Sequence, residues 1–153
     1  KRNASLRCTV MDLPHMMEEA QCLSRQGGVI GQVAFHGANM FETEWPAGCD
    51  CILLSDVLHD WNLERCAGLL EKALRILPEG GYLLVNEVLI NETRDGPLGA
   101  VLFSVMMLMR MEGNQFTMSE IKRLFRDVGF HEPQPISSFG YYTLLSAQKP
   151  FCV

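Results

Sequence analysis

The residues with the clearest chemical potential lie at positions 55–61, Ser-Asp-Val-Leu-His-Asp-Trp, directly after an apolar run at 51–54. Four consecutive apolar residues between polar ones predict a buried parallel strand, and open α/β sheets bind ligands beyond the carboxyl ends of such strands. His59 lies just past that end. Its imidazole changes charge near neutral pH, which makes it a candidate general base for a hydroxyl proton. A His beside a Trp after a strand is also often a capping or packing residue.

Two acidic residues occur where predicted strands end or are buried. Asp12 ends a β-type run at 6–11, before a helical pattern at 15–25. A carboxylate there can accept hydrogen bonds from both hydroxyls of a ribose, or it can begin a turn or cap the helix. Glu87 is the one ionisable residue in the apolar run 82–90. Because an unpaired carboxylate in a buried strand is costly, Glu87 needs a partner or a function.

Polar and apolar residues also follow the short strand predicted at 33–35. Asn39 offers an amide for the edge of a purine ring. Met40 and Phe41 offer thioether and ring surface for the face of that purine, although a Met-Phe pair is also ordinary core.

The remaining pattern alternates helices and strands. Apolar residues spaced by three and four predict an amphipathic helix over 63–77, and a second helix is predicted at 118–128. In a Met-rich helix over 97–111, apolar residues cover most of the circumference. We therefore expect this helix to be buried nearly all round, either as core or as the wall of a pocket for a flat apolar ligand. Two short strands, at 134–137 and 141–147, close the chain.

This order of elements predicts an α/β fold with an open, mostly parallel sheet and one antiparallel strand. The 153 residues fit a single domain, residues 1–153, and no apolar segment reaches the length of a membrane span. A net charge of -5 without a basic cluster argues against a nucleic-acid surface. The six cysteines form no CxxC pair, and several lie in apolar stretches that look buried. They favour free thiols in the cytosol over disulfides or a zinc site.

Five short blocks occur in the order and spacing of one family, and they are residues 10–14, 38–41, 58–61, 77–81 and 86–89. From about residue 6 to about residue 149, the chain resembles the catalytic domain of S-adenosylmethionine-dependent small-molecule O-methyltransferases. This group includes the caffeic acid and acetylserotonin O-methyltransferases, and residues 96–113 look most similar to the acetylserotonin branch. The resemblance implies a Rossmann-like class I methyltransferase sheet.

The resemblance also implies roles for the matched residues. Asp12 would hold the ribose hydroxyls of the methyl donor. His59 would remove the hydroxyl proton of a small aromatic acceptor, while Glu87 orients the imidazole and favours its protonated form. The other implied site residues are Asn39, Met40, Phe41 and Ser55 for the donor, Asp60 and Glu112 for catalysis, and Met106 and Met109 for the acceptor. No metal is implied, because an activated methyl group needs only proximity and a base.

Three positions depart from the family pattern. Asn39 stands where Asp is common, Gln115 where a second acid often lies beside the catalytic His, and Met106 where the acetylserotonin branch carries Asn. The identity of the acceptor is therefore open. Asp60 can assist the base or cap a helix.

By the same resemblance, the first strand of the sheet, its glycine-rich loop and a helical N-terminal domain are expected before Lys1. The missing strand belongs between the strands that end at Asp12 and Asp56, and a gap there leaves backbone groups unpaired. The isolated chain is therefore expected to bind the methyl donor weakly or not at all. The N-terminal domain would mediate homodimerisation.

Two other functions remain open. A catalytically degenerate relative with a dimerisation or scaffold role is compatible with Asn39 and Gln115. A nicotinamide dehydrogenase would need a glycine fingerprint upstream of Asp12.

Overall fold

The computed structural model describes residues 3–152, which form two compact units. The first unit ends at Pro46 and the second begins at Ala47. Each unit has its own sheet, and a single domain over residues 1–153 stays a prediction.

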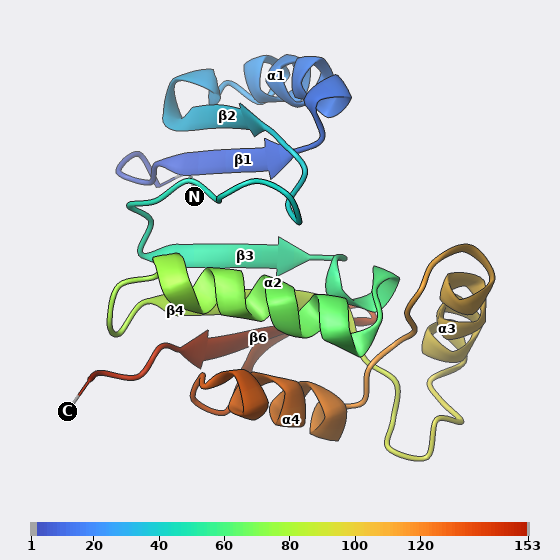
Figure 1. Ribbon diagram of the computed structural model, residues 1–153. Coiled ribbons are helices and arrows are strands. Elements are labelled where there is room, and N and C mark those ends of the chain that lie inside the picture. Colours follow the sequence, from blue (N-terminus) through green and yellow to red (C-terminus); the bar gives the residue numbers. More distant parts are fainter. Residues whose placement is uncertain (1–2, 153) are drawn as a thin grey trace. The chain divides into compact units, whose positions relative to one another are not determined.

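The first unit consists of two parallel strands and the segment that connects them (Figure 1). β1 (Cys8–Asp12) pairs with β2 (Val33–Gly37), and Asp12 lies opposite Gly37. The connection contains the 3-10 turn η1 (Pro14–Met16), the helix α1 (Met17–Gln26) and the 3-10 turn η2 (Ile30–Gln32). Because the two strands are parallel, their carboxyl ends meet at one edge of this small sheet.

The second unit contains a four-stranded sheet in the order β3-β4-β6-β5. β3 (Cys51–Ser55) is parallel to β4 (Tyr82–Val88), and β6 (Tyr142–Gln148) is antiparallel to both β4 and β5 (Gln134–Phe139). One strand, β6, therefore runs against the other three. The predicted α/β fold, mostly parallel with one antiparallel strand, is confirmed. Among residues 3–152, β1 and β3 belong to separate sheets.

Two helices of the second unit, α2 (Leu63–Ile76) and α4 (Met118–Val128), pack against each other beside the sheet (Figure 1). Both have well-formed ends. Asn62 caps α2 by accepting from the N–H of Arg65, and Thr117 forms a capping box with Glu120 at the start of α4. Gly129 ends α4 with a φ of 107°, a left-handed conformation that favours glycine.

The core of the second unit lies between these helices and the strands. Its fully buried side chains are contributed mainly by α2, α4, β4 and β6, and they include Leu69, Leu70, Leu83, Val85, Ile121, Phe125 and Leu145. Because the apolar residues of α2 and α4 share one face of each helix, burial of that face fixes both helices onto the sheet.

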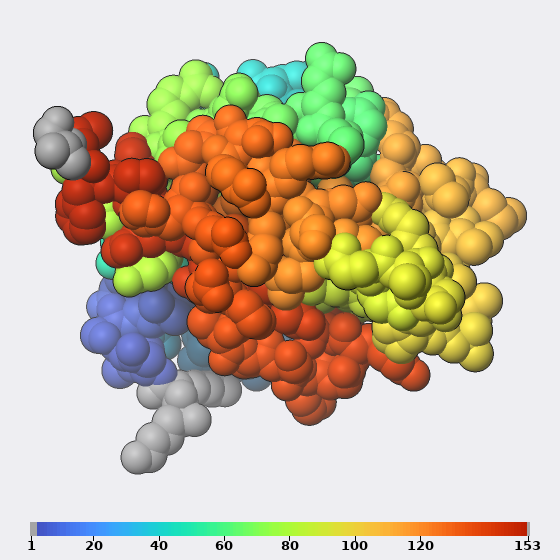
Figure 2. All heavy atoms as spheres, turned by 90° about the horizontal axis from the view of Figure 1, so that it is seen from below, coloured from blue at the N-terminus to red at the C-terminus, as the bar shows by residue number. Residues whose placement is uncertain are grey.

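The Met-rich helix α3 (Leu98–Arg110) differs from the sequence expectation. Its inner side packs through Ala100 against Val88 and Ile90. The opposite side is open: Leu98 is 72% exposed and Met109 is 80% exposed. Figure 2 shows the gold atoms of α3 projecting from one end of the second unit. The expectation of burial nearly all round is wrong for residues 3–152, because they provide a packing surface on one side of this helix only.

The cysteines also differ from expectation in their burial. All six are free, as predicted, but Cys66 is the one that is buried, whereas Cys8, Cys51 and Cys152 are exposed. The apolar neighbours of Cys8 and Cys51 lie in strands at sheet edges, which explains why the local pattern overestimated their burial. In the described part of the chain, no helix combines the length and the apolar character needed to cross a membrane.

Candidate active site

His59 lies in a short turn directly after the carboxyl end of β3. The 3-10 turn η3 (Leu58–Asp60) carries it, and the imidazole is buried, with 3% of the residue exposed. Before the turn, Asp56 adopts a left-handed conformation with a φ of 53°, and its N–H donates to the carbonyl of Asn86. Aspartate tolerates this conformation better than most residues, so the chain can change direction sharply after β3.

Glu87 is the direct partner of His59. Its Oε2 lies 2.5 Å from Nδ1 of His59, and its Oε1 accepts from the N–H groups of Val57 at 3.2 Å and Leu58 at 2.9 Å. Only 1% of Glu87 is exposed. One buried carboxylate therefore caps the turn and orients the ring. With Nδ1 donating to Glu87, Nε2 of the neutral imidazole is the atom with a lone pair available for a proton.

The charges around His59 favour its protonated form. Burial lowers the pKa of His59, but the hydrogen bond to Glu87 and the negative charges of Glu87, Asp60 and Asp56 outweigh burial and raise the pKa above its ordinary value. Asp60 lies close to the other ring nitrogen, with its Oδ1 3.4 Å from Nε2 of His59. Burial raises the pKa of Asp60, and Asp56 adds to this effect, while His59 opposes it. The surroundings thus suit a group that accepts a proton.

Asp56 and Tyr142 join this cluster although the sequence did not single them out. Tyr142 hydrogen-bonds to Asp56, and its pKa is raised by burial, then by Asp56 and Glu87. Asp56, His59 and Glu87 each offer a ligand atom within 4.8 Å of the others, a spacing that can hold a metal ion. Two of those groups, His59 and Glu87, are hydrogen-bonded to each other. The position of Asp56 directly after a strand was the available sequence signal.

Glu112 contacts the turn that carries His59 and not the imidazole ring. Its backbone N–H donates to the carbonyl of Asp60 at 3.0 Å. Its Oε2 accepts from Nδ2 of Asn62 at 2.9 Å and lies 3.2 Å from Nε of Arg65, whose guanidinium lies over the Trp61 ring. The predicted catalytic role of Glu112 stays a prediction.

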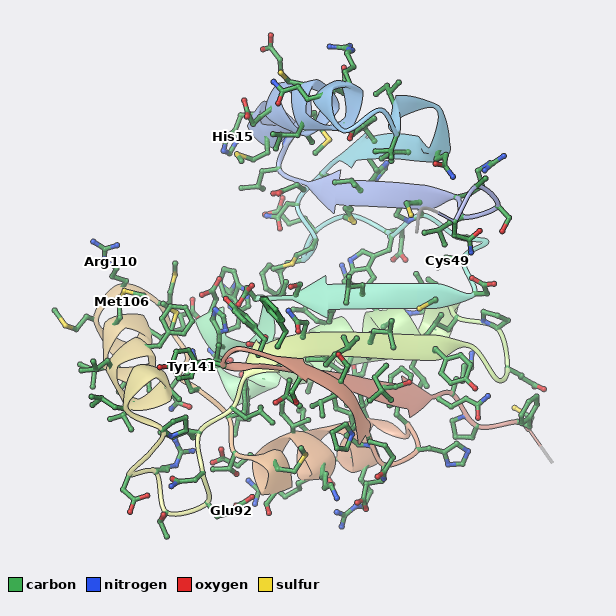
Figure 3. The ribbon with its side chains drawn as sticks, turned by 180° about the vertical axis from the view of Figure 1, so that it is seen from behind. His15, Cys49, Glu92, Met106, Arg110 and Tyr141 are labelled. Carbon is green, nitrogen blue, oxygen red and sulfur yellow. The ribbon has the colours of Figure 1, made fainter. Side chains whose placement is uncertain are left out.

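The helix α3 reaches His59 through Phe103. The two rings meet edge to face, with centroids 5.2 Å apart and an interplanar angle of 71°. Met106 follows Phe103 by three residues and neighbours it on the helix surface, whereas Met109, six residues on, belongs to the open side of the helix, where it is 80% exposed. Figure 3 labels Met106 and Arg110 on the outer part of α3 and Tyr141 beside it. The acceptor-binding roles of Met106 and Met109 stay predictions, and Phe103 was missed because one aromatic residue in an apolar helix carries no distinguishing signal.

Gln115 is a buried amide with unusual surroundings. It is fully buried, and its backbone N–H donates to Oγ of Ser104 at 3.3 Å. Neither Nε2 nor Oε1 of its side chain has a hydrogen-bond partner among residues 3–152. Unpaired buried amides are costly, so Gln115 is a candidate for a role beyond packing.

Four of the five residues predicted for the methyl donor lie in the first unit, and they are Asp12, Asn39, Met40 and Phe41. Asp12 is exposed at the end of β1, its Oδ1 accepts from the N–H of Leu13 at 2.7 Å, and its carbonyl accepts from the N–H of Ala38 at 2.8 Å. Asn39 Oδ1 accepts from the N–H of Phe41 at 3.0 Å, and Nε1 of Trp45 donates to the carbonyl of Met40 at 2.8 Å. The strand pairing thus brings Asp12 beside the segment 38–41.

The side chains of Asp12 and of the segment 39–41 fit an adenosine group. The exposed carboxylate of Asp12 suits a pair of ribose hydroxyls, and the segment 39–41 offers an amide with adjoining apolar side chains for a purine. Ser55, also predicted for the donor, belongs to the second unit, where its Oγ accepts from Nδ2 of Asn86 at 3.1 Å.

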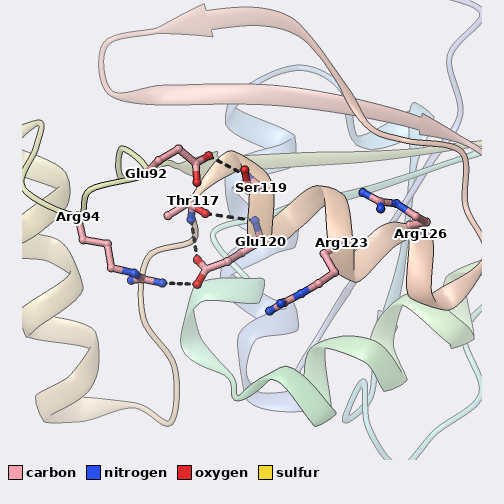
Figure 4. A pocket seen from close by; sticks show the side chains of 7 residues that line it. All are labelled: Glu92, Arg94, Thr117, Ser119, Glu120, Arg123 and Arg126. Carbon is pink, nitrogen blue, oxygen red and sulfur yellow. Dashed lines mark hydrogen bonds and ion pairs between the residues drawn. The ribbon is translucent and has the colours of Figure 1, made fainter.

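A separate surface hollow lies at the start of α4 (Figure 4). It is lined by Glu92, Arg94, Thr117, Ser119, Glu120, Arg123 and Arg126. Its acids already have partners within the chain: Glu92 accepts from the N–H of Ser119, and Glu120 pairs with Arg94 and accepts from the N–H of Thr117. The acidic side chains that line this hollow therefore cap the start of α4.

The fold and the buried His–Glu pair define a class of protein, and comparison with known proteins agrees with it. Residues 2–131 match the family model of the O-methyltransferase domain, so the chain belongs to this family. The predicted family is confirmed.

Individual relatives support the same assignment. The chain is 33% identical over 136 residues to the 3-hydroxy-5-methyl-1-naphthoate 3-O-methyltransferase of Streptomyces sahachiroi, covering 89% of this chain and 39% of that protein. It is also 33% identical over 144 residues to the acetylserotonin O-methyltransferase of Homo sapiens, covering 94% of this chain and 41% of that protein.

Solved structures share the fold. An O-methyltransferase family 2 protein from Planctomyces limnophilus, in complex with apigenin, superposes with a TM-score of 0.88 at 33% identity, covering 94% of this chain and 42% of that one. Human N-acetylserotonin methyltransferase in complex with SAM gives 0.86 at 31% identity, with coverages of 95% and 41%. The chain thus spans 39% to 42% of the length of these four relatives.

Proposed function

We propose that the protein is an O-methyltransferase that moves a methyl group from S-adenosylmethionine to a hydroxyl group of a small aromatic acceptor, with His59 as the general base. The observation that carries this proposal is the buried contact of 2.5 Å between Nδ1 of His59 and Oε2 of Glu87 at the carboxyl end of β3. The named activities of the relatives support the same reaction class.

His59 acts on the hydroxyl group of the acceptor. Its Nε2 accepts the hydroxyl proton, and the acceptor oxygen becomes a stronger nucleophile as the proton leaves. The positive charge that forms on the imidazole is stabilised by the carboxylate of Glu87 at Nδ1 and by Asp60, 3.4 Å from Nε2. S-adenosylmethionine supplies, when bound, a methyl group on a positively charged sulfur, which needs no further activation.

Residues of the first unit hold the donor. Asp12 accepts hydrogen bonds from the ribose hydroxyls, and Asn39 recognises the purine edge through its amide. Met40 and Phe41 provide apolar contact, and Ser55 is assigned to the same donor. The neutral Asn39 makes the adenine contact independent of charge.

The acceptor is a flat aromatic molecule that contacts the side of α3 facing His59. Phe103 is placed edge-on to the imidazole, and Met106 neighbours it one turn further along the helix. Met109, on the open side of α3, is assigned to the same acceptor. The two relatives named above act on a hydroxynaphthoate and on acetylserotonin, both aromatic compounds. The proposal includes a cytoplasmic location without nucleic-acid or membrane partners, supported by the net charge of -5 and the free cysteines. It also includes a homodimer, which rests on the family resemblance alone.

The test compares His59→Ala with His131→Ala, a substitution of an exposed His, in the full-length protein. Methyl transfer from radiolabelled S-adenosylmethionine is measured with N-acetylserotonin and with a hydroxynaphthoate as acceptors. We expect His59→Ala to lower turnover about 10²- to 10⁴-fold, the usual contribution of a general base, while calorimetry shows unchanged binding of S-adenosylhomocysteine. Unchanged turnover in His59→Ala would remove His59 as the base.

A second candidate function is a non-catalytic relative with a dimerisation or scaffold role. It is favoured by Gln115, a buried amide at a position where the family often has an acid. The same calorimetry separates the two candidates, because a full-length protein that does not bind S-adenosylhomocysteine fits the second and not the first.

A further inference from the structure

We infer that Gly113 and Cys66 position His59 by holding the backbone of its turn from two sides, so that the imidazole meets Glu87. This inference rests on the proposed role of His59 as the base. Neither Gly113 nor Cys66 touches the reacting atoms in this assignment, and both act through His59.

Gly113 holds the turn by close approach. The N–H of the preceding Glu112 donates to the carbonyl of Asp60 at 3.0 Å, which places the next residue against the turn. A Cβ added at Gly113 would overlap the carbonyl oxygen of His59 and lie 2.5 Å from the carbonyl oxygen and 2.7 Å from the nitrogen of Trp61. All three atoms are backbone atoms, so no side-chain rotation relieves the overlap. Any residue other than glycine must therefore shift the backbone of the His59 turn, or the loop that carries Gly113, and so loosen the contact between them.

Cys66 holds the same turn from α2. It is fully buried, and its Sγ lies 3.1 Å from the carbonyl oxygen of Leu58 and 3.5 Å from that of Trp61. Burial, and then the charge of Glu87, raise the pKa of this thiol to about 12. The thiol therefore stays protonated at neutral pH and donates to carbonyls on both sides of His59.

The two contacts complement those of Glu87. Glu87 fixes the N–H groups of Val57 and Leu58, Cys66 fixes the carbonyl of Leu58, and Gly113 limits the carbonyl of His59. Little freedom remains except rotation of the imidazole. That rotation is set by the contact with Glu87 and by the edge of Phe103.

The pKa of His59 reports this geometry in solution. The charged or titratable groups around it are Glu87 on β4, Asp60 within the turn, Asp56 at the end of β3 and Tyr142 on β6, which bonds to Asp56. Of these, Glu87 has the largest raising effect, through a hydrogen bond that depends on the position of the turn. A displaced turn therefore lowers the pKa of His59 toward or below its ordinary value.

The first experiment compares Gly113→Ala with Gly68→Ala. Gly68 lies within α2, and a Cβ added there meets nothing within 4 Å, so it is a matched control. The imidazole signals of the chain are titrated by NMR, with the signal of His59 assigned from His59→Asn, and kcat and KM are measured in the full-length protein with N-acetylserotonin as the acceptor. We expect Gly113→Ala to lower the pKa of His59 and to lower kcat by about 100-fold with donor affinity retained, as for an ångström-scale displacement of a catalytic group. Gly68→Ala leaves both quantities unchanged.

The second experiment compares Cys66→Ala with Cys66→Ser, and it applies even where Gly113→Ala does not fold. Ala removes the donor, whereas Ser keeps an O–H group that can reach the same carbonyls. We expect Cys66→Ala to lower kcat by roughly 10-fold, the equivalent of about one neutral hydrogen bond, and to lower the pKa of His59. Cys66→Ser restores both toward wild-type values.

The outcomes separate this inference from the proposed function. Full turnover in His59→Ala contradicts the proposed function. In that case the NMR titration of His59 still shows whether Gly113 and Cys66 position the turn. The inference alone is overturned by a different pair of results. His59→Ala loses turnover, but Cys66→Ala and any folded Gly113→Ala protein keep the wild-type kcat and the wild-type pKa of His59.

Discussion

Nδ1 of His59 and Oε2 of Glu87 lie 2.5 Å apart, although 28 residues separate them in the chain. Parallel pairing of β3 with β4 causes this contact, because it places Ser55 opposite Asn86 and so brings Glu87, the next residue of β4, beside the turn that follows β3. The pair is buried, and its carboxylate also caps the turn that carries the imidazole. Glu87, a residue of the neighbouring strand, therefore contributes to both the orientation and the charge of the candidate base.

Replacing Glu87 with Gln tests the charge of that residue. The amide oxygen can still cap the turn, but the negative charge beside the imidazole is lost, so we expect kcat to fall by about 10²- to 10⁴-fold. Because the proposed base works as neutral imidazole, we expect activity to rise as pH increases through the pKa of His59. Glu87→Gln lowers that pKa, and the rise in activity moves to lower pH. The pH profile of kcat checks this, with the exposed Glu71→Gln as control; a profile that does not move contradicts the assignment.

The raised pKa of His59 also predicts a dependence of stability on pH. The ordinary pKa is 6.5 and the folded value is higher, since Glu87, Asp60 and Asp56 outweigh burial. The stabilisation is therefore complete below the unfolded pKa and is lost as pH rises through the folded pKa. Urea unfolding of wild type and His59→Asn, from about pH 5 to about pH 9, measures the difference in free energy of unfolding. This difference should shrink with rising pH, and a difference that grows would reverse the sign we infer.

Gln115 provides a test of a buried polar group. Its side-chain amide is fully buried without a partner in the described chain, so Gln115→Leu should raise the free energy of unfolding by about 1–2 kcal/mol. Gln148→Leu is the comparison, because Nε2 of Gln148 donates to the carbonyl of Gly80 at 2.8 Å and its loss should destabilise the fold. Chemical unfolding gives both values. If the acceptor binds the Gln115 amide, Gln115→Leu also raises KM for that acceptor. A Gln115→Leu protein that is less stable than wild type would contradict the prediction, because it would show that the amide has a hydrogen-bond partner in the folded protein.

Asp12→Asn isolates the charge proposed to bind the ribose. Asn keeps an oxygen for the N–H of Leu13, which Oδ1 of Asp12 accepts at 2.7 Å, so the end of β1 should be preserved. Loss of hydrogen bonds to a charged group predicts roughly 10- to 100-fold weaker binding of S-adenosylhomocysteine by the full-length protein. Calorimetry measures this, with Asp50→Asn, an exposed acid just before β3, as the control. Equal affinities for wild type and Asp12→Asn would exclude Asp12 from the donor site.

Much of the site was predictable because it depends on strand ends. The apolar runs before Asp12 and His59 gave strands that end within one or two residues of the predicted positions, and parallel strand ends share an edge. The lone carboxylate of Glu87 in an apolar run then indicated a partner, and His59 is that partner. Local pattern and sheet geometry were sufficient for these contacts.

The support around His59 was not predictable in the same way. Gly113 and Phe103 reach His59 or its turn from a loop and a helix that are distant in sequence, and Cys66 reaches the turn from the following helix. None of the three has a local signature. The burial of α3 was overestimated for a related reason. Apolar residues all round a helix indicate that every side of it packs against something. They do not indicate whether the packing partner belongs to the same chain segment.

The thiol of Cys66 offers a chemical reporter for the turn that carries His59. Cys8 and Cys152 are exposed, while Cys66 is fully buried and its pKa is raised to about 12. Thiolate is the species that alkylating reagents attack, so Cys66 should react only when the turn opens and the thiol leaves the carbonyls of Leu58 and Trp61. The rate at which iodoacetamide labels Cys66, followed by mass spectrometry, would therefore count openings of the His59 turn without any substrate.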